Sequence, residues 1–592
     1  MPSFNCDTGV ETLGLQDLSD GWKDCTAITI FPTKDFSAGV NFNSTWSGCT
    51  SMVSMSPLDL GYQLTEVTSL SRTWENCSSL VDFDSDYPIC FYACTTFDRV
   101  WRGCQSLTSF PNMVVEAGQY FYGTWFGCIG LTSFPLLDFS SAIELGNSSH
   151  GGPWQFCTGL QSFPLINTAS VTTFTKTWRD CNSLTSFPAI DTSSALSLSE
   201  TWRSCGSLTS FPLIDTSSVI LFTRTWYSCN NLTSFPEIDT SQGVSFQETW
   251  ELCANLTSFP LLDFSKAYNL DRTWNECYDL TSFPQITLKP PGSPGQPLNS
   301  LTQTWSNCHS LTSFPLLDTS GISSFSGTWQ NCYDLASFPA IDTSAATSLY
   351  RTWMRCSSLT SFPLIDTSSV GNLNDTWREC SSLISFPLID TSGCTTLGYT
   401  WLDCSGLTSF PLLNTSNVTD FDGAWRNNSS LTSFPLIDTS SGSVFGGQNS
   451  FQSLGFTGTW QGCTGLTSFP ALNFDNGTIF EATWFNCTSL VDFPANMFDN
   501  CTATNFNLAW RGCALSSQSV DNILVSLDTA GQSNGTVLID QGTNSYPGAA
   551  GLAAKTSLEA RGWTVIIADS GWFQSLEDWR PNIDFQRVWS VP

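Results

Sequence analysis

The feature that most constrains the fold of this chain is a sequence repeat of about 24 residues that recurs along most of its length. Residues 183–205 read SLTSFPAIDTSSALSLSETWRSC, and close copies occupy residues 207–229 and 231–253. A catalytic site is built once, whereas a scaffold or a filament is built by repetition, because stacked repeats extend one unit without closing it. Each copy carries one Trp, and the repeat Trp residues are Trp22, Trp46, Trp74, Trp101, Trp125, Trp154, Trp178, Trp202, Trp226, Trp250, Trp274, Trp305, Trp329, Trp353, Trp377, Trp401, Trp425, Trp460, Trp484 and Trp510.

Within a copy, apolar residues recur at every third position counted from the Trp. This spacing is neither the period of a helix nor the alternation of a strand, and it is typical of a coil that turns corners with one brief extended segment at LTSF. Stacked coils pair such segments into a parallel sheet with strands about 4.8 Å apart. We predict a solenoid of about 20 coils of ~24 residues, with a parallel sheet along one face. The residues predicted to form its core ladder include Trp178, Cys181, Leu184, Phe187, Ile190, Trp202, Cys205, Trp226 and Cys229.

The sequence DTS that follows the extended segment predicts a corner of the coil. Pro after the Phe removes a ladder donor and ends the strand. The Asp then closes an Asx turn with its side-chain oxygen, a role that Asn167 and Asn414 fill in other copies. The alternative is a ladder of carboxylates for calcium, which the Asn copies weaken because they lower the charge. We predict turns and no cofactor or metal, with corner residues Asp191, Asp215, Asp239, Asp342 and Asp366.

The repeated Trp and Cys residues each allow two interpretations. A row of Trp residues suggests a sugar-binding platform, but their step with the apolar positions predicts burial. Nineteen of the 24 Cys residues follow a repeat Trp by three positions, and only Trp425 has Asn428 there. Spacing by a whole coil is not metal spacing, and adjacent coils bring Cys residues within disulfide reach, yet a buried thiol is a good small apolar group. We predict reduced core cysteines, with Cys90 and Cys94 as the exception.

The two residues between each Trp and Cys vary from copy to copy, so we expect them to point outward. The pairs are Arg179 and Asp180, Tyr227 and Ser228, Met354 and Arg355, and Leu402 and Asp403.

Composition excludes several classes of function. The net charge of −30 disfavours nucleic acid and anionic membranes as partners. No stretch is apolar enough to insert into a membrane, and the N-terminus lacks the basic start and apolar run of a secretory signal, so we expect a soluble chain made in the cytoplasm. With two His residues, no phosphate-binding loop and no G-x-S-x-G motif, we predict that the protein is not an enzyme.

Three insertions interrupt the repeat, near residues 143–153, 288–299 and 441–455. All lie between a corner and the next Trp, which predicts one shared side of the solenoid. Insertions in repeat proteins often form a binding face, so we predict that these contact a host-surface glycan or protein. The alternative is tolerated drift of loop length.

The repeat pattern ends after Cys513. One helical pattern covers SVDNILVSLDTAG, with Gly531 past its end, and a second starts near Pro547. Each is followed by a strand pattern, NGTVLID and WTVIIA. We predict an N-terminal cap or partial coil over residues 1–20, the solenoid over 21–515, a small α/β cap over 516–569 and a Trp-rich tail over 570–592. Exposed Trp, Phe and Arg are typical of interfaces, so the predicted docking residues of the tail are Trp572, Phe573, Trp579, Arg580, Phe585 and Trp589. The alternative is that the tail packs back on the cap.

Two resemblances add to these predictions. The order aromatic, two residues, Cys, two residues, Leu, short strand and Asp-Thr-Ser corner resembles the BspA-like leucine-rich-repeat group over roughly residues 10 to 515, with Trp where that group commonly has Phe or Met. This resemblance implies a leucine-rich-repeat solenoid with a role in adhesion and recognition. Residues 520–565 resemble a module at the ends of repeat regions in phage structural and tail-fibre proteins.

Together these features predict a non-enzymatic phage virion protein, either a fibre or a capsid decoration protein. It would join other virion proteins through its C-terminal tail and could contact the host surface. The alternative is a bacterial cell-surface adhesin of the leucine-rich-repeat type, and self-association into a homo-oligomer stays open for both.

Overall fold

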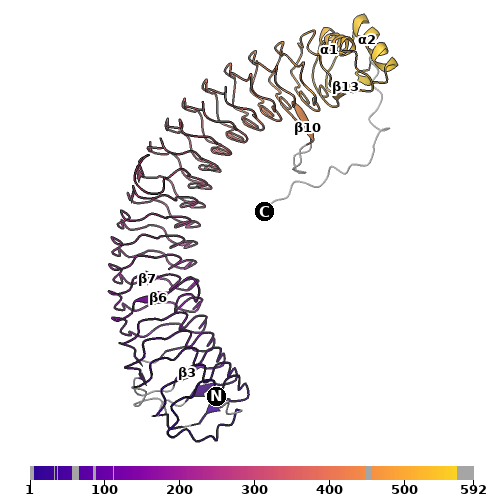
Figure 1. Ribbon diagram of the computed structural model, residues 1–592. Coiled ribbons are helices and arrows are strands. Elements are labelled where there is room, and N and C mark those ends of the chain that lie inside the picture. Colours follow the sequence, from indigo (N-terminus) through magenta and orange to yellow (C-terminus); the bar gives the residue numbers. More distant parts are fainter. Residues whose placement is uncertain are drawn as a thin grey trace. The chain divides into compact units, whose positions relative to one another are not determined.

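The computed structural model describes residues 6–32, 34–36, 38–55, 66–83, 89–110, 113–448 and 456–569. Its contacts divide the chain into two compact units, Met1–Asn417 and Val418–Pro592, and each is described here by itself. In both units the chain winds into coils stacked one on the next (Figure 1).

Two parallel ladders of backbone hydrogen bonds join the coils of the first unit. The predicted ladder at LTSF is present, since Thr257 N–H donates to Thr233 O at 3.2 Å. The second ladder starts six residues before each Trp, where Ile220 N–H donates to Leu196 O and Val244 N–H to Ile220 O, both at 2.9 Å. It continues through the Trp, where Trp202 N–H donates to Thr225 O at 3.0 Å. The solenoid with parallel pairing is therefore confirmed, and the second ladder is one that the sequence did not reveal.

The strands assigned in the first unit are two or three residues long and pair in parallel. They are β1 (Ile30–Phe31), β2 (Ser54–Met55) and β3 (Asp82–Phe83) in one sheet, and the pairs β4 (Ile89–Cys90) with β5 (Met113–Val114), β6 (Glu144–Gly146) with β7 (Thr173–Phe174), and β8 (Asp263–Phe264) with β9 (Thr287–Leu288).

The core of each coil is an aromatic stack that continues into the next coil. Trp178 and Trp202 lie with ring centroids 5.7 Å apart and planes 7° from parallel. Phe187 stands nearly perpendicular to both, at 4.7 Å from Trp178 and 5.3 Å from Trp202. All three are buried. Such stacked and edge-to-face pairs stabilise beyond the area that they bury, and the pairs that Trp202 makes with Trp178 and Phe187 join successive repeats.

The Cys that follows each Trp has a specific hydrogen bond as well as a place in the core. Cys205 Sγ donates to Trp178 O at 3.1 Å, and Cys229 Sγ to Trp202 O at 3.2 Å, so each thiol binds the backbone of the preceding coil. Burial raises the pKa of Cys229 to about 12, which keeps the thiol protonated as the donor. These cysteines form no disulfide, and each S–H serves as a hydrogen-bond donor.

Buried Thr hydroxyls make equivalent bonds at two other places in the coil. Thr201, which precedes Trp202, donates from Oγ1 to Phe174 O at 3.0 Å. Thr216 of the corner donates to Asp239 O of the next coil at 2.6 Å. Buried polar groups cost free energy unless they are hydrogen-bonded, and here each bond also fixes one coil on its neighbour.

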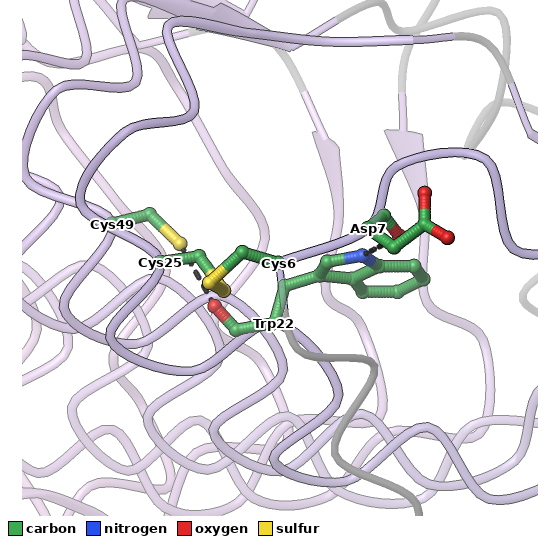
Figure 2. The surroundings of a disulfide bond; sticks show 5 residues. All are labelled: Cys6, Asp7, Trp22, Cys25 and Cys49. Atoms are coloured by element: carbon green, nitrogen blue, oxygen red, sulfur yellow. Dashed lines mark hydrogen bonds between the residues drawn. A yellow bond between two sulfur atoms is a disulfide. The ribbon is translucent and has the colours of Figure 1, made fainter.

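The exception among the cysteines lies at the N-terminal end of the stack, not where the sequence suggested. Cys90 and Cys94 keep their thiols, and Cys6 is joined to Cys25 in a disulfide (Figure 2). Cys25 is the ladder Cys of the first described coil, and its sulfur is bonded to Cys6 in place of the carbonyl that the other ladder thiols bind. The same segment supplies Asp7 O, which accepts the indole N–H of Trp22 at 2.9 Å. The disulfide thus holds residues 6 and 7 over the first coil.

The second unit ends in an α/β segment after its coils. Helix α1 (Ser517–Thr529) begins at Ser516, whose hydroxyl accepts the Ser519 N–H, and α2 (Ala549–Ala560) follows as expected from the sequence. Strands β12 (Asn505–Phe506), β13 (Thr536–Ile539) and β14 (Thr564–Ile567) form one parallel sheet, so the segment extends the pairing of the last coil. Its role as a cap stays a prediction. Neither described helix has the length and hydropathy of a membrane span.

Helix α2 is held on α1 by one carboxylate. Asp521 Oδ1 accepts the Gly548 N–H at 2.7 Å and the Gly551 N–H at 3.0 Å. These are first-turn donors of α2, which has no side-chain cap of its own. A carboxylate at a helix N-terminus also interacts favourably with the helix dipole.

The other strands of this unit, β10 (Gly446–Gln448) and β11 (Phe456–Gly458), form an antiparallel pair.

The one coil without its ladder Cys gives a test of this account of the core. Asn428 is fully buried, and neither its Nδ2 nor its Oδ1 has a partner among the described residues. Because an unsatisfied buried polar group costs about 1–3 kcal/mol, Asn428→Cys should raise the free energy of unfolding by about that amount in urea titrations followed by Trp fluorescence. The reciprocal change Cys380→Asn should lower it by a similar amount. Equal stability of all three proteins would contradict the account.

Candidate functional site

Charge on the coils is concentrated beside the repeat Trp. Fourteen of the 21 Lys and Arg residues lie within two positions of one: Lys23, Arg72, Arg99, Arg102, Lys176, Arg179, Arg203, Arg224, Arg272, Arg351, Arg355, Arg378, Arg426 and Arg511. We call the positions from two before to two after each repeat Trp the Trp-flanking band. This signal was present in the sequence, and considering only the two residues after each Trp missed six of the fourteen.

Ion pairs in the band join the same position of adjacent coils. Arg224 Nε lies 2.7 Å from Glu248 Oε2, and Arg355 Nε lies 2.8 Å from Glu379 Oε2. Burial opposes the charge of Glu248, but the hydrogen bond and charge of Arg224 outweigh it and lower the pKa of that carboxyl. Burial raises the pKa of Glu251, whose Oε1 still accepts from Arg272 at 2.6 Å. Some charges of the band thus link adjacent coils, and others pair within one coil, as Arg203 does with Glu200 at 3.0 Å.

The backbone of the band is turned in a way that side chains rarely adopt. The residues two positions before a Trp have a positive φ: 56° for Glu200, 54° for Arg224 and 55° for Glu248. A positive φ is unfavourable for residues other than Gly and Asn. Hydrogen bonds between coils hold this conformation, such as Glu200 N–H to Thr223 O at 2.9 Å.

The residues between Trp and Cys are less exposed than the sequence suggested. Met354 is 6 % exposed and Leu402 is 1 % exposed, so the prediction that these two point outward is wrong. The position directly after Trp faces the neighbouring coil, which explains why it accepts apolar residues. Arg179, Asp180 and Tyr227 are half-buried at the coil edge, as are Ser228, Arg355 and Asp403.

The corner residues form local turns. Asp215 Oδ1 accepts the Ser217 N–H at 2.9 Å and its hydroxyl at 2.7 Å, and these bonds lower the pKa of Asp215. The same bond to the residue two positions on is made by Asp191, Asp239, Asp342 and Asp366 and by Asn167 and Asn414. Among the described residues no group of three or more His, Cys, Asp or Glu could hold a metal ion.

The insertion at residues 143–153 forms a compact hairpin on the first unit. Asn147 and Gly151 form an antiparallel bridge, and Lys176 Nζ donates to Ser148 O at 3.0 Å. A Cβ built on Gly152 would lie 2.1 Å from Lys176 O, so the hairpin lies directly against the next coil. Its backbone is largely engaged by its own turn and by that coil.

The insertion at residues 288–299 instead borders a partly open hollow of about 670 Å³ together with the two preceding coils. Its apolar wall consists of Val244 and Tyr268, which occupy the same ladder position in successive coils, together with Pro290 and Pro294. Tyr268 is 39 % exposed there. We call this space the insertion hollow.

Polar groups complete the insertion hollow. They are Ser265, Lys266, Lys289, Ser293 and Gln296. Lys266 Nζ donates to Gln242 Oε1 at 2.6 Å, and Lys289 Nζ donates to Gln296 O at 2.5 Å. Both ammonium groups are held at its edge by uncharged acceptors.

The insertion is anchored at both ends and at its tip. Leu288 and Leu298 are buried. A Cβ built on Gly321 of the next coil would lie 3.2 Å from Pro291 Cβ, so that glycine leaves room for the proline. The four Pro residues further restrict the segment. The insertion hollow is therefore formed without a ligand, as binding pockets usually are.

Two other predicted sites fall largely outside the described part of the chain. In the insertion near residues 441–455, residues 449–455 lie outside it, and β10 and β11 form the described stem. The tail also lies outside it, with its predicted docking residues Trp572, Phe573, Trp579, Arg580, Phe585 and Trp589.

Comparison with known proteins gives matches only among solved structures. No protein-family model and no curated protein matches the chain. A leucine rich cell surface protein from Faecalibacterium prausnitzii A2-165 is 17 % identical, with a TM-score of 0.32 over 55 % of this chain and 83 % of that one. TLR13 in its complex with ssRNA13 is 12 % identical, with a TM-score of 0.21 over 96 % and 85 %. The plant peptide hormone receptor RGFR1 with RGF2 is 13 % identical, with a TM-score of 0.19 over 88 % and 86 %.

These likenesses are weak, and the fold assignment rests on the parallel ladders and the stacked cores themselves. The chain is a solenoid of stacked coils joined by parallel backbone pairing. None of the three structures is described as a phage protein, so they give no support to the predicted virion role or to the phage-like end module.

The pair Arg224 and Glu248 predicts a pH-dependent contribution to stability. Because the pKa of Glu248 is lowered from 4.5 in the folded state, the pair stabilises the fold above that pH and loses this effect as the pH falls through the lowered value. Glu248→Gln should therefore reduce the free energy of unfolding by about 1 kcal/mol at pH 7, and by much less at pH 3.

Urea titrations at the two pH values measure the difference. Glu237→Gln, a change of an exposed carboxylate, is the matched control and should be neutral at both. A loss of equal size at pH 3 and pH 7 would show that the ion pair is not its cause.

Proposed function

We propose that this protein is a non-enzymatic recognition protein of the adhesin type, in which the coils are a scaffold and the insertion hollow receives the ligand. The observation that carries this proposal is the insertion itself. Residues 288–299 interrupt the 24-residue spacing of the coils on either side, are anchored by buried leucines, and border a space with apolar, hydroxyl and ammonium groups. A concave, largely preformed space of this composition is what ligand sites have in common.

A second observation bears on where the protein acts. The disulfide between Cys6 and Cys25 closes the N-terminal end of the stack, and disulfides persist in oxidising compartments such as the cell exterior. The ladder cysteines are compatible with that environment because burial raises the pKa of their thiols, and the thiol is much less reactive than the thiolate. We infer a location at the cell surface or outside the cell.

The proposal also accounts for the titratable groups. The shifted carboxyl of Glu248 is paired with Arg224 in a link between coils, and the shifted thiols are core hydrogen-bond donors. These roles are structural. Attachment to a virion through the tail stays a prediction.

Deletion of residues 291–297 tests the proposal. The spacing from Trp274 to Trp305 is 31 residues, and removing seven restores 24. The shortened coil aligns Leu288 with Phe264 and Leu298 with Ala267, all of which are buried, so the stack should remain folded. We expect the full chain to bind members of printed glycan and peptide arrays, and the deletion to abolish that binding because it removes Pro294 and Gln296 from the hollow.

The matched control is deletion of residues 147–151, which restores 24 residues between Trp125 and Trp154 (29 − 5) without touching the insertion hollow. This variant should bind like the full chain. Circular dichroism and Trp fluorescence verify that all three proteins are folded. The proposal is wrong if no array member retains the full chain, or if the chain lacking 291–297 binds as well.

The inferred location predicts the state of the cysteines in protein taken directly from the producing cells. If thiols are alkylated before lysis, peptide mass spectrometry should find Cys6 linked to Cys25 and should find the buried ladder cysteines modified only after denaturation. Alkylated Cys6 and Cys25 in the native protein would indicate a reducing compartment and would contradict the inferred location.

A further inference from the structure

We infer that the insertion hollow takes a saccharide that bears a carboxylate. The inference rests on the proposed function and names the chemical class of its ligand. It is carried by the juxtaposition of two lysines, an exposed tyrosine and several hydroxyl and amide groups in one preformed space.

The charge of the hollow is opposite to that of the chain. The protein has a net charge of −30, yet the described residues that line the hollow include Lys266 and Lys289 and no acid. Among the described residues neither lysine has a carboxylate within ion-pair distance. The nearest acid along the chain, Asp263, accepts the Ser265 N–H at 2.8 Å. The hollow is therefore a local site for an anion on an acidic molecule, where neighbouring charge would repel polyanions.

The two lysines retain the capacity to bind an anion. An ammonium group has three N–H donors, and one bond is seen for each lysine, to Gln242 Oε1 and to Gln296 O. These uncharged acceptors orient the ammonium groups without neutralising them. A carboxylate between them would gain charge-assisted hydrogen bonds, which are roughly twice as strong as neutral ones.

The remaining lining suits the body of a sugar. A pyranose ring presents C–H groups on its face and hydroxyls around its edge. Tyr268 and Pro294 offer apolar surface for the face, and Ser265, Ser293 and Gln296 offer donors and acceptors for the edge. A purely apolar ligand would leave these polar groups without partners, which costs free energy.

The surface next to the hollow would accommodate a longer chain. One ladder position is occupied in four successive coils by Leu196, Ile220, Val244 and Tyr268. Each of the last three donates its backbone N–H to the carbonyl of the one before, at 2.9 Å. Leu196 is 48 % exposed and Ile220 is 39 % exposed. This apolar row leads into the hollow, so an oligosaccharide could extend along it with its acidic residue held by the lysines.

Titration calorimetry with two pairs of saccharides tests the inference on the full chain. The acidic members are trigalacturonate and sialyllactose, and their neutral counterparts are methyl-esterified trigalacturonate and lactose. We expect at least one acidic member to bind roughly tenfold more tightly than its counterpart at low salt, with the difference shrinking as salt screens the partly exposed charges.

Variants identify the groups responsible. Lys266→Gln and Lys289→Gln should each weaken binding of the acidic saccharide about fivefold and leave the neutral one unchanged, whereas Tyr268→Ala should weaken both. The control is Lys176→Gln combined with Lys555→Gln, which removes two positive charges at positions that do not line the hollow.

The outcomes separate this inference from the proposed function. If neither acidic saccharide binds more tightly than its neutral counterpart, or if the lysine changes have no effect, the inference is overturned. It is also overturned if a peptide carboxylate binds at the lysines in place of both saccharides. In each of these cases array binding that requires residues 291–297 would keep the proposed function. If no array binding requires those residues, both fall.

Discussion

The contact between one coil and the next is the interaction on which the rest of the structure depends. A single coil cannot bury its own Trp, because the indole face is covered by the Trp of the adjacent coil at 5.7 Å in the pair Trp178 and Trp202. The backbone is satisfied in the same way, through ladders, thiols and hydroxyls that bind the neighbouring coil. Stability in such a stack is a sum over neighbours. In the first described coil the link from Cys6 to Cys25 takes the place of the thiol bond that the other ladder cysteines make.

This dependence explains why so many residues are repeated unchanged. Three residues after each repeat Trp, the side chain must be small, buried and able to donate one hydrogen bond to a carbonyl. Cys meets all three needs. Asn428 shows the limit, since its amide is too polar for the space and finds no partner there among the described residues. Thr at two places has the same task with its hydroxyl. What is free to vary is the coil edge, where side chains meet water.

Sequence periodicity was sufficient to predict the part of the fold that each coil repeats. The step of three from Trp178 anticipated the parallel ladder at LTSF, and local patterns gave both helices of the second unit. The second ladder was missed because its residues, such as Thr172, Leu196 and Tyr268, share no chemical type. The positive φ of Arg224 contradicts local preference and is imposed by the next coil. The disulfide of Cys6 and the closure of the insertion hollow likewise depend on residues that the fold brings together from different coils.

A specific site is difficult to form on a repeated scaffold, because each coil presents nearly the same side chains as its neighbour. A unique site needs an interruption, and the corner-to-Trp segment is the place where an interruption disturbs the core least. Lengthening a loop adds only a small entropic cost, and Leu288 and Leu298 return the chain to its buried positions on either side. Lys266 and Tyr268 belong to an ordinary coil, and only the insertion turns them into one wall of a hollow. Recognition can therefore be added to such a solenoid by changing one loop, while every contact that stabilises the stack is kept.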